Sequence, residues 1–199
     1  MSTLAHGDNI ETKIRQEKNP ANRKLLEEIY STYLKWKENN LKITTTTDKD
    51  IEKKVALLND YKQFIINPAY KKEKGNLAGF TSQSQLHSSV LEEFMYYLFK
   101  DIPKISTKKF FWGRTTAYTS LFFAPPNIDS FEERSNIVIN TKNQDFSISK
   151  EVILKSRVFN NEEWQENTIY VPIVSIECKT YLDKTMYEGS VSTAEKIKR

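Results

Sequence analysis

The run TIYVPIVSIECKT, residues 168–180, constrains the fold of this chain more than any other segment. It is the most apolar run in the sequence and is rich in β-branched residues, which predicts a central β-strand. Pro172 places the start of this strand near a sheet edge or a bulge, because proline has no N–H to donate to a ladder. Side chains alternate between the faces of a strand, so we expect Glu177 and Lys179 on one face and Cys178 on the other.

The overall composition sets few limits on function. A length of 199 residues suits one domain with a helical segment attached, and 30 basic against 26 acidic residues permit nucleic-acid binding without requiring it. No run is apolar enough to span a membrane, and the polar N-terminus lacks the apolar stretch of a secretion signal. A single cysteine excludes an internal disulfide and agrees with a cytoplasmic location.

The first half of the chain has helical periodicity. We expect a disordered or frayed polar tail over residues 1–19 and a helical segment over residues 20–76. Within that segment, apolar residues repeat at helical spacing from Pro20 to about Trp36 and again from about residue 48 to 65. This pattern predicts an antiparallel helix pair with a scaffold role, followed by an exposed basic connector at residues 71–76.

A core is expected over residues 77–199, beginning with a third helix. Ser82 and Gln85 fit a capping box, and the helix is predicted to run to about Lys100. On this helix Glu92 should point away from the apolar face, whereas Glu93 lies at its edge. His87 falls on the apolar face, where we expect a core or site-lining histidine.

Strand patterns follow the third helix. Residues 108–126 are aromatic and β-branched, residues 136–140 alternate, and residues 146–159 form one strand or two joined at residues 150–151. The polar loop around Trp164 is short enough to join this segment to the apolar strand as an antiparallel pair. A last helix is expected to begin near Ser192. The order of elements predicts an α+β fold.

Two carboxylates and a lysine form the candidate site. Asp145 is expected to open the strand that pairs with the one ending at Glu177, so the two acids would meet across the ladder. Magnesium prefers oxygen ligands and keeps several waters, so two carboxylates and a substrate phosphate suffice to hold it. Lys179 would orient the attacking water and offset phosphate charge, and the Cys178 carbonyl is a further candidate ligand.

Each part of this site has an alternative. An E-x-K pair on a strand is commonly a solvated ion pair, although here it follows an unusually apolar run. Asp129, in PPNIDSFEER, is the rival first acid, and a weaker strand pattern follows it. Glu93 is a candidate third catalytic acid because it comes from the preceding helix.

Other chemistries are disfavoured. The Cys178 side chain is expected to face the core as a small hydrophobe, not as a nucleophile. His6 lies in the expected tail, and two histidines with one cysteine cannot form an ordinary structural zinc site. No glycine-rich phosphate loop is present in the sequence.

A weaker signal for DNA contact lies in KKFFWGRTTAY. Lys108 and Lys109 are candidates for phosphate contacts, and Arg114 is a candidate for reading a base edge. A sheet strand that begins with solvated lysines explains the same pattern equally well.

At these residues the chain resembles type II restriction endonucleases of the PD-(D/E)XK superfamily, and more narrowly the Bpu10I-like family. The resemblance lies in GFTSQSQLHSSVLEEFMYYLF, KKFFWGRTTAYTSLFF, NQDFSISKEVILKS and, above all, VSIECKTYLDKTMYEGSVSTAEKIK. It covers most of residues 79–198. The superfamily motif is short and degenerate, whereas the string around IECKTYLDKTM is far more specific.

The resemblance implies a central mixed sheet flanked by helices and magnesium-dependent cleavage of both strands of DNA at a short sequence. It implies Asp145 and Glu177 as metal ligands, with Mn²⁺ as a substitute ion, Lys179 as the catalytic lysine and Glu93 as an added helix acid. A DNA methyltransferase would be the genetic partner in a restriction-modification system, and the enzyme would act as a homodimer or heterodimer.

The chain departs from the superfamily pattern in two ways. It has Gln-Asp where Pro-Asp is often found, and it ends 20 residues after Lys179 with EKIKR, inside a helical pattern. The second departure favours a core incomplete at its C-terminus, and with it a truncated or inactive DNA-binding remnant. A repair or recombination nuclease that reads DNA structure is a further alternative.

Overall fold

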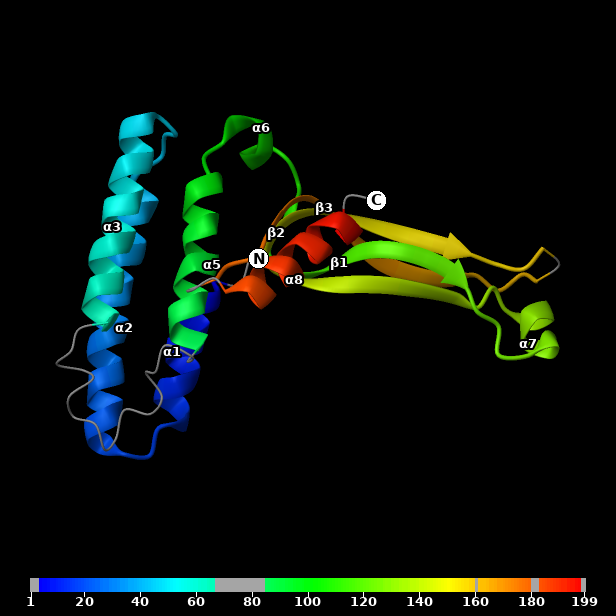
Figure 1. Cartoon of the computed structure of the whole chain (residues 1–199), viewed down its shortest axis with the longest axis horizontal. Helices are drawn as coiled ribbons and strands as arrows, with labels where there is room; N and C mark the ends of the chain where they lie inside the picture. Colours follow the sequence, from blue (N-terminus) through cyan, green and yellow to red (C-terminus); the bar gives the residue numbers. More distant parts are fainter. Residues whose placement is uncertain (1–3, 67–84, 160, 180–182, 198–199) are drawn as a thin grey trace. The chain divides into compact units, whose positions relative to one another are not determined.

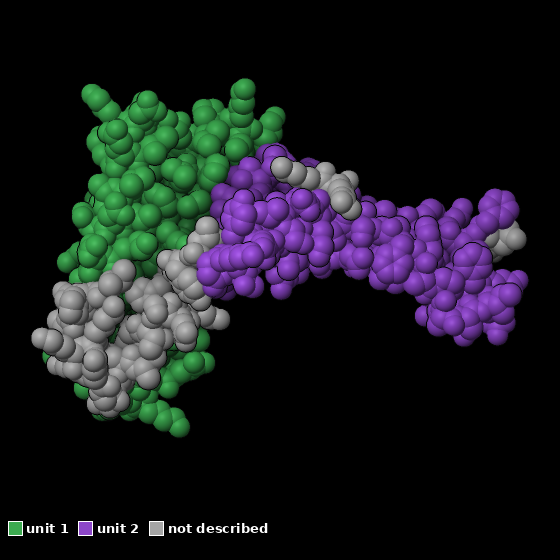
Figure 2. All heavy atoms as spheres, in the orientation of Figure 1, with its two compact units in different colours: residues 1–109, 178–180 green, residues 110–177, 181–199 purple. Residues whose placement is uncertain are grey.

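The computed structural model describes residues 4–66, 85–159, 161–179 and 183–197. The chain is α+β, with helices first and a three-stranded mixed sheet after them. It divides into two compact units, residues 1–109 with 178–180 and residues 110–177 with 181–199 (Figure 2). The boundary between a helical segment and an endonuclease core near residue 76 stays a prediction. The Ser82 cap, the 71–76 connector and the His87 side chain lie outside the described residues.

The first unit is helical. Its elements are α1 (Ala5–Gln16), α2 (Pro20–Lys42), α3 (Asp48–Ile66), α5 (Gln85–Phe99) and the short α6 (Pro103–Ser106). Figure 1 shows α2 and α3 side by side, as predicted. Asn19 caps α2 by accepting from the N–H groups of Ala21 and Asn22, with Pro20 in the first turn.

The expectation of a disordered tail over residues 1–19 is wrong. Helix α1 packs against α2 and α5, and His6, Gly7 and Ile10 are buried. The helix signal in the sequence is weak here because few apolar residues repeat, and α1 is held by buried polar groups such as His6 as well as by Ile10. Glu92 corrects a second expectation, since it is buried and does not point to solvent.

The core of the first unit is largely aromatic. The Trp36 and Tyr61 rings stack with centroids 5.0 Å apart, and Tyr97 meets Trp36 edge-on at 5.2 Å. Aliphatic side chains of the same cluster complete it: Ile10, Ile29, Leu58, Ile65, Leu86 and Val90. These rings come from α2, α3 and α5, so the core ties the helices together.

The second unit contains β1 (Phe111–Phe123), α7 (Ile128–Glu133), β2 (Ile137–Ser156), β3 (Gln165–Ile176) and α8 (Lys184–Ile197). Strand β2 pairs antiparallel with both β1 and β3, and one parallel bridge between Ala117 and Tyr170 joins β1 to β3. The predicted hairpin around Trp164 is therefore confirmed. The central strand, however, is β2 and not the apolar β3.

Strand β2 is one continuous strand that folds back on itself. A straight strand of this length would span about 65 Å. Yet the Ser135 hydroxyl, just before β2, lies 2.9 Å from the hydroxyl of Ser156, its last residue. The bend falls where the β2–β3 register shifts between Ile148 and Ser149, and every residue from Phe146 to Ser149 is buried there.

Helix α8 begins at Lys184, well before the expected start near Ser192. The Asp183 carboxylate accepts from the N–H of Met186 at 2.7 Å, which caps the helix. Figure 1 shows α8 beside the sheet, where it contacts β1. None of the helices in the described ranges has the length and apolar character needed to cross a bilayer.

Candidate active site

The two predicted acids come from paired strands in the second unit. Asp145 lies within β2 at the start of its bend, and Glu177 directly follows β3. The last pair of the β2–β3 ladder is Phe146 with Ile176. Asp145 and Glu177 directly adjoin this last pair along their two chains, just beyond the ladder. We expected Asp145 to open a strand, but it lies inside β2.

Asp145 lines a pocket of about 500 Å³ on the β1–β2 side. Arg114 of β1 lines the same pocket, together with Asn143, Tyr170 and Thr115. The β1–β2 register shifts between Gly113 and Thr115, and Gly113 has φ 124°, a backbone conformation that favours glycine. This bulge lies directly at Arg114, and base readout by Arg114 stays a prediction.

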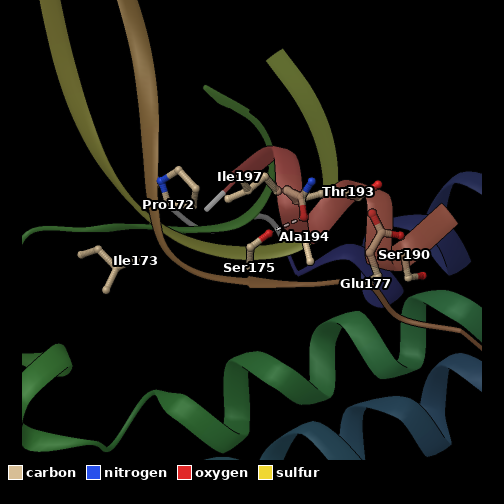
Figure 3. A pocket seen from close by; sticks show the side chains of 9 residues that line it. Pro172, Ile173, Ser175, Glu177, Ser190, Thr193, Ala194 and Ile197 are labelled. Carbon is tan, nitrogen blue, oxygen red and sulfur yellow. Dashed lines mark hydrogen bonds between the residues drawn. The ribbon is translucent and has the colours of Figure 1, made fainter. Parts of the chain in front are cut away.

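Glu177 lines a second pocket of about 510 Å³, between β3 and α8. Figure 3 shows Glu177 and Ser175 on the strand side, and Ser190 and Thr193 on the helix side. The pocket also includes Pro172, so the proline that interrupts the strand pattern helps to form its wall. Both pockets are open to solvent-sized molecules and are built within one unit.

Gln144 borders both pockets, and the sequence analysis did not single it out. Its Nε2 donates to the Asn143 carbonyl at 2.9 Å, and its Oε1 accepts a short hydrogen bond from the Ser175 hydroxyl. Gln144 is 4 % exposed, whereas Ser175 is exposed, so the contact joins a buried amide to a surface hydroxyl. The signal available in the sequence was the glutamine that stands where Pro-Asp motifs have proline, directly before Asp145.

Cys178 and Lys179 follow the end of β3. Cys178 is a buried free cysteine, in agreement with the expected core-facing side chain, and Lys179 is exposed. The strand ends at Ile176, so the alternation expected for Glu177, Cys178 and Lys179 is not fixed by a ladder. Lys179 is two residues from Glu177, a separation that spans at most about 7 Å along the chain.

Asp129 does not take the place of Asp145. It is exposed in the first turn of α7, which follows β1 at the end of the sheet away from the β2 bend. The segment after it, expected as a weak strand, is helical. The short helix forms because the Asn127 side chain accepts from the Ser130 N–H at 2.8 Å.

Glu93 lies in the first unit and is 2 % exposed. Its Oε2 accepts from the backbone N–H groups of His6 and Gly7, and its Oε1 accepts from the hydroxyls of Tyr33 and Tyr97. These contacts account for its burial, and its catalytic role stays a prediction. Lys108 and Lys109 are exposed just before β1, where contact with DNA phosphates also stays a prediction.

No three histidine, cysteine, aspartate or glutamate side chains gather as a metal cage among the described residues. The donor set at the end of the β2–β3 ladder, two carboxylates that adjoin its last pair, suits a magnesium ion that takes further oxygens from water and phosphate. We therefore regard Asp145 and Glu177 as fitting Mg²⁺ in chemistry and number.

The comparison with known protein families agrees with this architecture. The family model of the Bpu10I restriction endonuclease matches residues 83–199, which is more than half of the chain. No curated protein matches the chain. The chain belongs to the Bpu10I restriction endonuclease family, and its class is therefore that of type II restriction enzymes.

Proposed function

We propose that this chain is a site-specific nuclease that hydrolyses phosphodiester bonds of double-stranded DNA with Mg²⁺. The observation that supports the proposal is that Asp145 and Glu177 directly adjoin Phe146 and Ile176, the last pair of the β2–β3 ladder. The family supports a restriction nuclease. Asp145 and Glu177 supply the candidate metal ligands, because a phosphodiesterase metal site needs paired carboxylates.

In this proposal Asp145 and Glu177 hold the ion, with the Cys178 carbonyl as a further ligand. Bound Mg²⁺ would neutralise charge on the scissile phosphate, and Mn²⁺ could substitute for it. Arg114, which shares the Asp145 pocket, donates to a non-bridging phosphate oxygen. Lys179 orients the attacking water and offsets the charge that develops in the transition state.

Single substitutions of the proposed site test this mechanism. Asp145→Ala, Glu177→Ala and Lys179→Ala should each lower Mg²⁺-dependent plasmid cleavage by at least about 100-fold, because each removes a group that acts on the reacting phosphate or water. Cleavage is followed by gel, and folding by circular dichroism.

A matched control is available on the same strand. Glu166→Ala removes a carboxylate from β3 that pairs with Lys155 at 2.9 Å, and both side chains are about half exposed. It should cleave like the wild type. Wild-type rates in all three site variants would refute the mechanism.

The biological role follows from the substrate. Discrete plasmid fragments would identify a sequence-specific enzyme, whereas preference for branched DNA would identify a structure-reading nuclease. In a restriction-modification system, host DNA treated with the cognate methyltransferase should resist cleavage.

A further inference from the structure

One side-chain hydrogen bond links the two strands that carry the acids. It joins Gln144, the residue directly before Asp145, to Ser175, two residues before Glu177. The Gln144 side chain is oriented for this contact, because its Nε2 is held by the Asn143 carbonyl and its Oε1 therefore faces Ser175.

This contact lies where the backbone ladder gives the acids least support. The ladder between β2 and β3 stops at Phe146 and Ile176, so neither Asp145 nor Glu177 is part of a ladder pair on this side. On the other side of β2, the β1 register shifts at the bulge before Thr115, which is the partner of Gln144. The backbone alone therefore leaves the spacing of the acids weakly fixed.

One partner of this contact is buried and the other is exposed. Gln144 is 4 % exposed and lines both the Asp145 pocket and the Glu177 pocket, whereas Ser175 lies on the exposed side of β3. The buried Gln144 amide is therefore the fixed partner, and Ser175 is held against it.

We propose that Gln144 and Ser175 are positioning residues that hold Asp145 and Glu177 at the spacing needed to bind one divalent ion. This inference rests on the proposed function, since it presupposes that the two acids bind metal. It gives the side chain of Gln144 a role in positioning the neighbouring Asp145. Residues that orient metal ligands from behind typically change metal affinity by about 10–100-fold when they are replaced.

The test is metal binding measured without DNA. Mn²⁺ is titrated calorimetrically into the full chain carrying Ser175→Ala, which removes the donor, or Gln144→Met, which keeps the shape and removes the acceptor. Each should weaken Mn²⁺ binding by about 10-fold or more, and each should raise the Mg²⁺ concentration for half-maximal cleavage. Ser175→Thr retains the hydroxyl and should bind Mn²⁺ like the wild type.

Asn140→Ala provides the matched control. Asn140 also lies on β2 and makes an amide-to-hydroxyl bond to a neighbouring strand, from its Nδ2 to Ser120 of β1 at 3.0 Å. It is away from the acids, so its loss should leave Mn²⁺ affinity unchanged. Comparing melting temperatures of the Ser175→Ala and Asn140→Ala variants separates positioning from general loss of stability.

The outcomes distinguish this inference from the proposed function. If Asp145→Ala and Glu177→Ala lose Mn²⁺ binding while Ser175→Ala and Gln144→Met keep it, the positioning role is refuted and the nuclease proposal stands. If the affinity falls only in proportion to melting temperature, or equally in Ser175→Thr, the role is structural and the inference is refuted. If the wild type binds no Mn²⁺ and cleaves no DNA, both fall.

Discussion

At the scale of single residues, Glu93 shows how a carboxylate can be buried without a charged partner. Its two oxygens accept four hydrogen bonds, two from the N-terminal backbone of α1 and two from tyrosine hydroxyls. Burial raises the pKa values of Tyr33 and Tyr97, with the Glu93 charge as a further cause, so both remain hydroxyl donors. All four of these groups donate to Glu93, so the hydrogen bonds favour its ionised carboxylate, which has no proton to donate.

The neighbouring His6 has a defined protonation pattern. The Ser89 hydroxyl donates to the Leu86 carbonyl at 3.3 Å, so it accepts from His6 Nδ1, 3.0 Å away. The Nε2 atom then accepts from the Tyr61 hydroxyl at 2.7 Å. The neutral ring with its proton on Nδ1 satisfies these contacts without an unpaired donor.

Glu93 predicts a pH dependence of stability. Burial raises its pKa in the folded protein, an effect that its hydrogen bonds oppose. The pKa of Glu93 in the unfolded chain is about 4.3, and its pKa in the folded chain is higher. At pH values between the two, the folded chain therefore binds a proton that the unfolded chain has released. Its contribution to the free energy of unfolding is present below that window and is lost as pH rises through it.

The comparison of the wild type with Glu93→Gln isolates this effect. Glu93→Gln presents an NH₂ group to two donors and should cost about 1–3 kcal/mol at neutral pH. It should also remove the Glu93 part of the pH dependence, so that the difference in unfolding free energy between the two proteins grows as pH falls through the window. Urea denaturation from pH 4 to 8 measures it. A pH-independent difference would contradict the raised pKa.

At the scale of elements, α1 is held by a close approach that only glycine permits. A Cβ built on Gly7 would lie 2.4 Å from the Tyr33 hydroxyl oxygen. Tyr33 cannot move aside easily, because it is 2 % exposed and donates to Glu93. The helix therefore docks where its backbone touches a fixed ring.

Two glycine substitutions should have opposite effects. Gly7→Ala should destabilise the protein by about 1–3 kcal/mol through overpacking. Gly189→Ala, within α8, has no atom within 4 Å of the new Cβ and should be neutral or stabilising by up to about 1 kcal/mol. Thermal unfolding of both variants measures the contrast. Equal melting temperatures would show that Gly7 does not set the packing of α1.

The elements that could be predicted are those with periodic apolar residues. Helices α2, α3 and α5 and the β2–β3 hairpin follow from spacing alone. Helix α1 could not be predicted, because its docking depends on His6 and Gly7 meeting Glu93 more than 80 residues away. The fold-back of β2 was missed for a similar reason, since Ser135, Ser156 and Gln165 meet only in the folded chain.

The candidate site was predictable to the same extent. The predicted hairpin brings the chain positions of Asp145 and Glu177 to the same end of the β2–β3 ladder, whereas their role as metal ligands stays a prediction. Gln144 was missed because a glutamine carries no charge pattern, and its bond to Ser175 runs diagonally across the ladder. Asp129 was a rival only because its short helix could not be told from a strand.

At the scale of the whole molecule, charge limits where DNA can lie on the second unit. The end of this unit away from the β2 bend has more acidic than basic residues. Glu132 and Glu133 lie by α7, and Glu162, Glu163 and Glu166 lie around the start of β3, where Lys155 pairs with Glu166 and Arg157 stacks on Trp164. The Asn161 side chain donates to the Glu133 carbonyl at 2.9 Å, which brings these segments together. An anionic backbone should avoid this end and favour the one with the acid pair and Arg114.

Salt dependence tests this placement. Lys108→Ala and Lys109→Ala should each lower the slope of log affinity against log salt by about 1, because each removes one phosphate contact. Fluorescence anisotropy of labelled DNA with Ca²⁺ in place of Mg²⁺ measures the slope. Glu163→Ala, at the acidic end, serves as the control and should leave the slope unchanged. Unchanged slopes for both lysine variants would assign DNA contact to other residues.

One proposed acid pair per chain has a consequence for double-strand cleavage. A single pair cuts one phosphodiester bond at a time, so cutting both strands together needs two chains. We therefore expect a fivefold excess of Glu177→Ala over wild type to yield nicked circular plasmid, since mixed dimers carry one working site. Gel analysis of supercoiled, nicked and linear forms measures this, with wild type alone at the same total concentration as control. If linear plasmid still forms without a nicked intermediate, at a rate proportional to the fraction of wild-type chains in the mixture, each chain cuts both strands alone. If wild type alone only nicks, the second cut belongs to a different subunit, and the enzyme is a heterodimer.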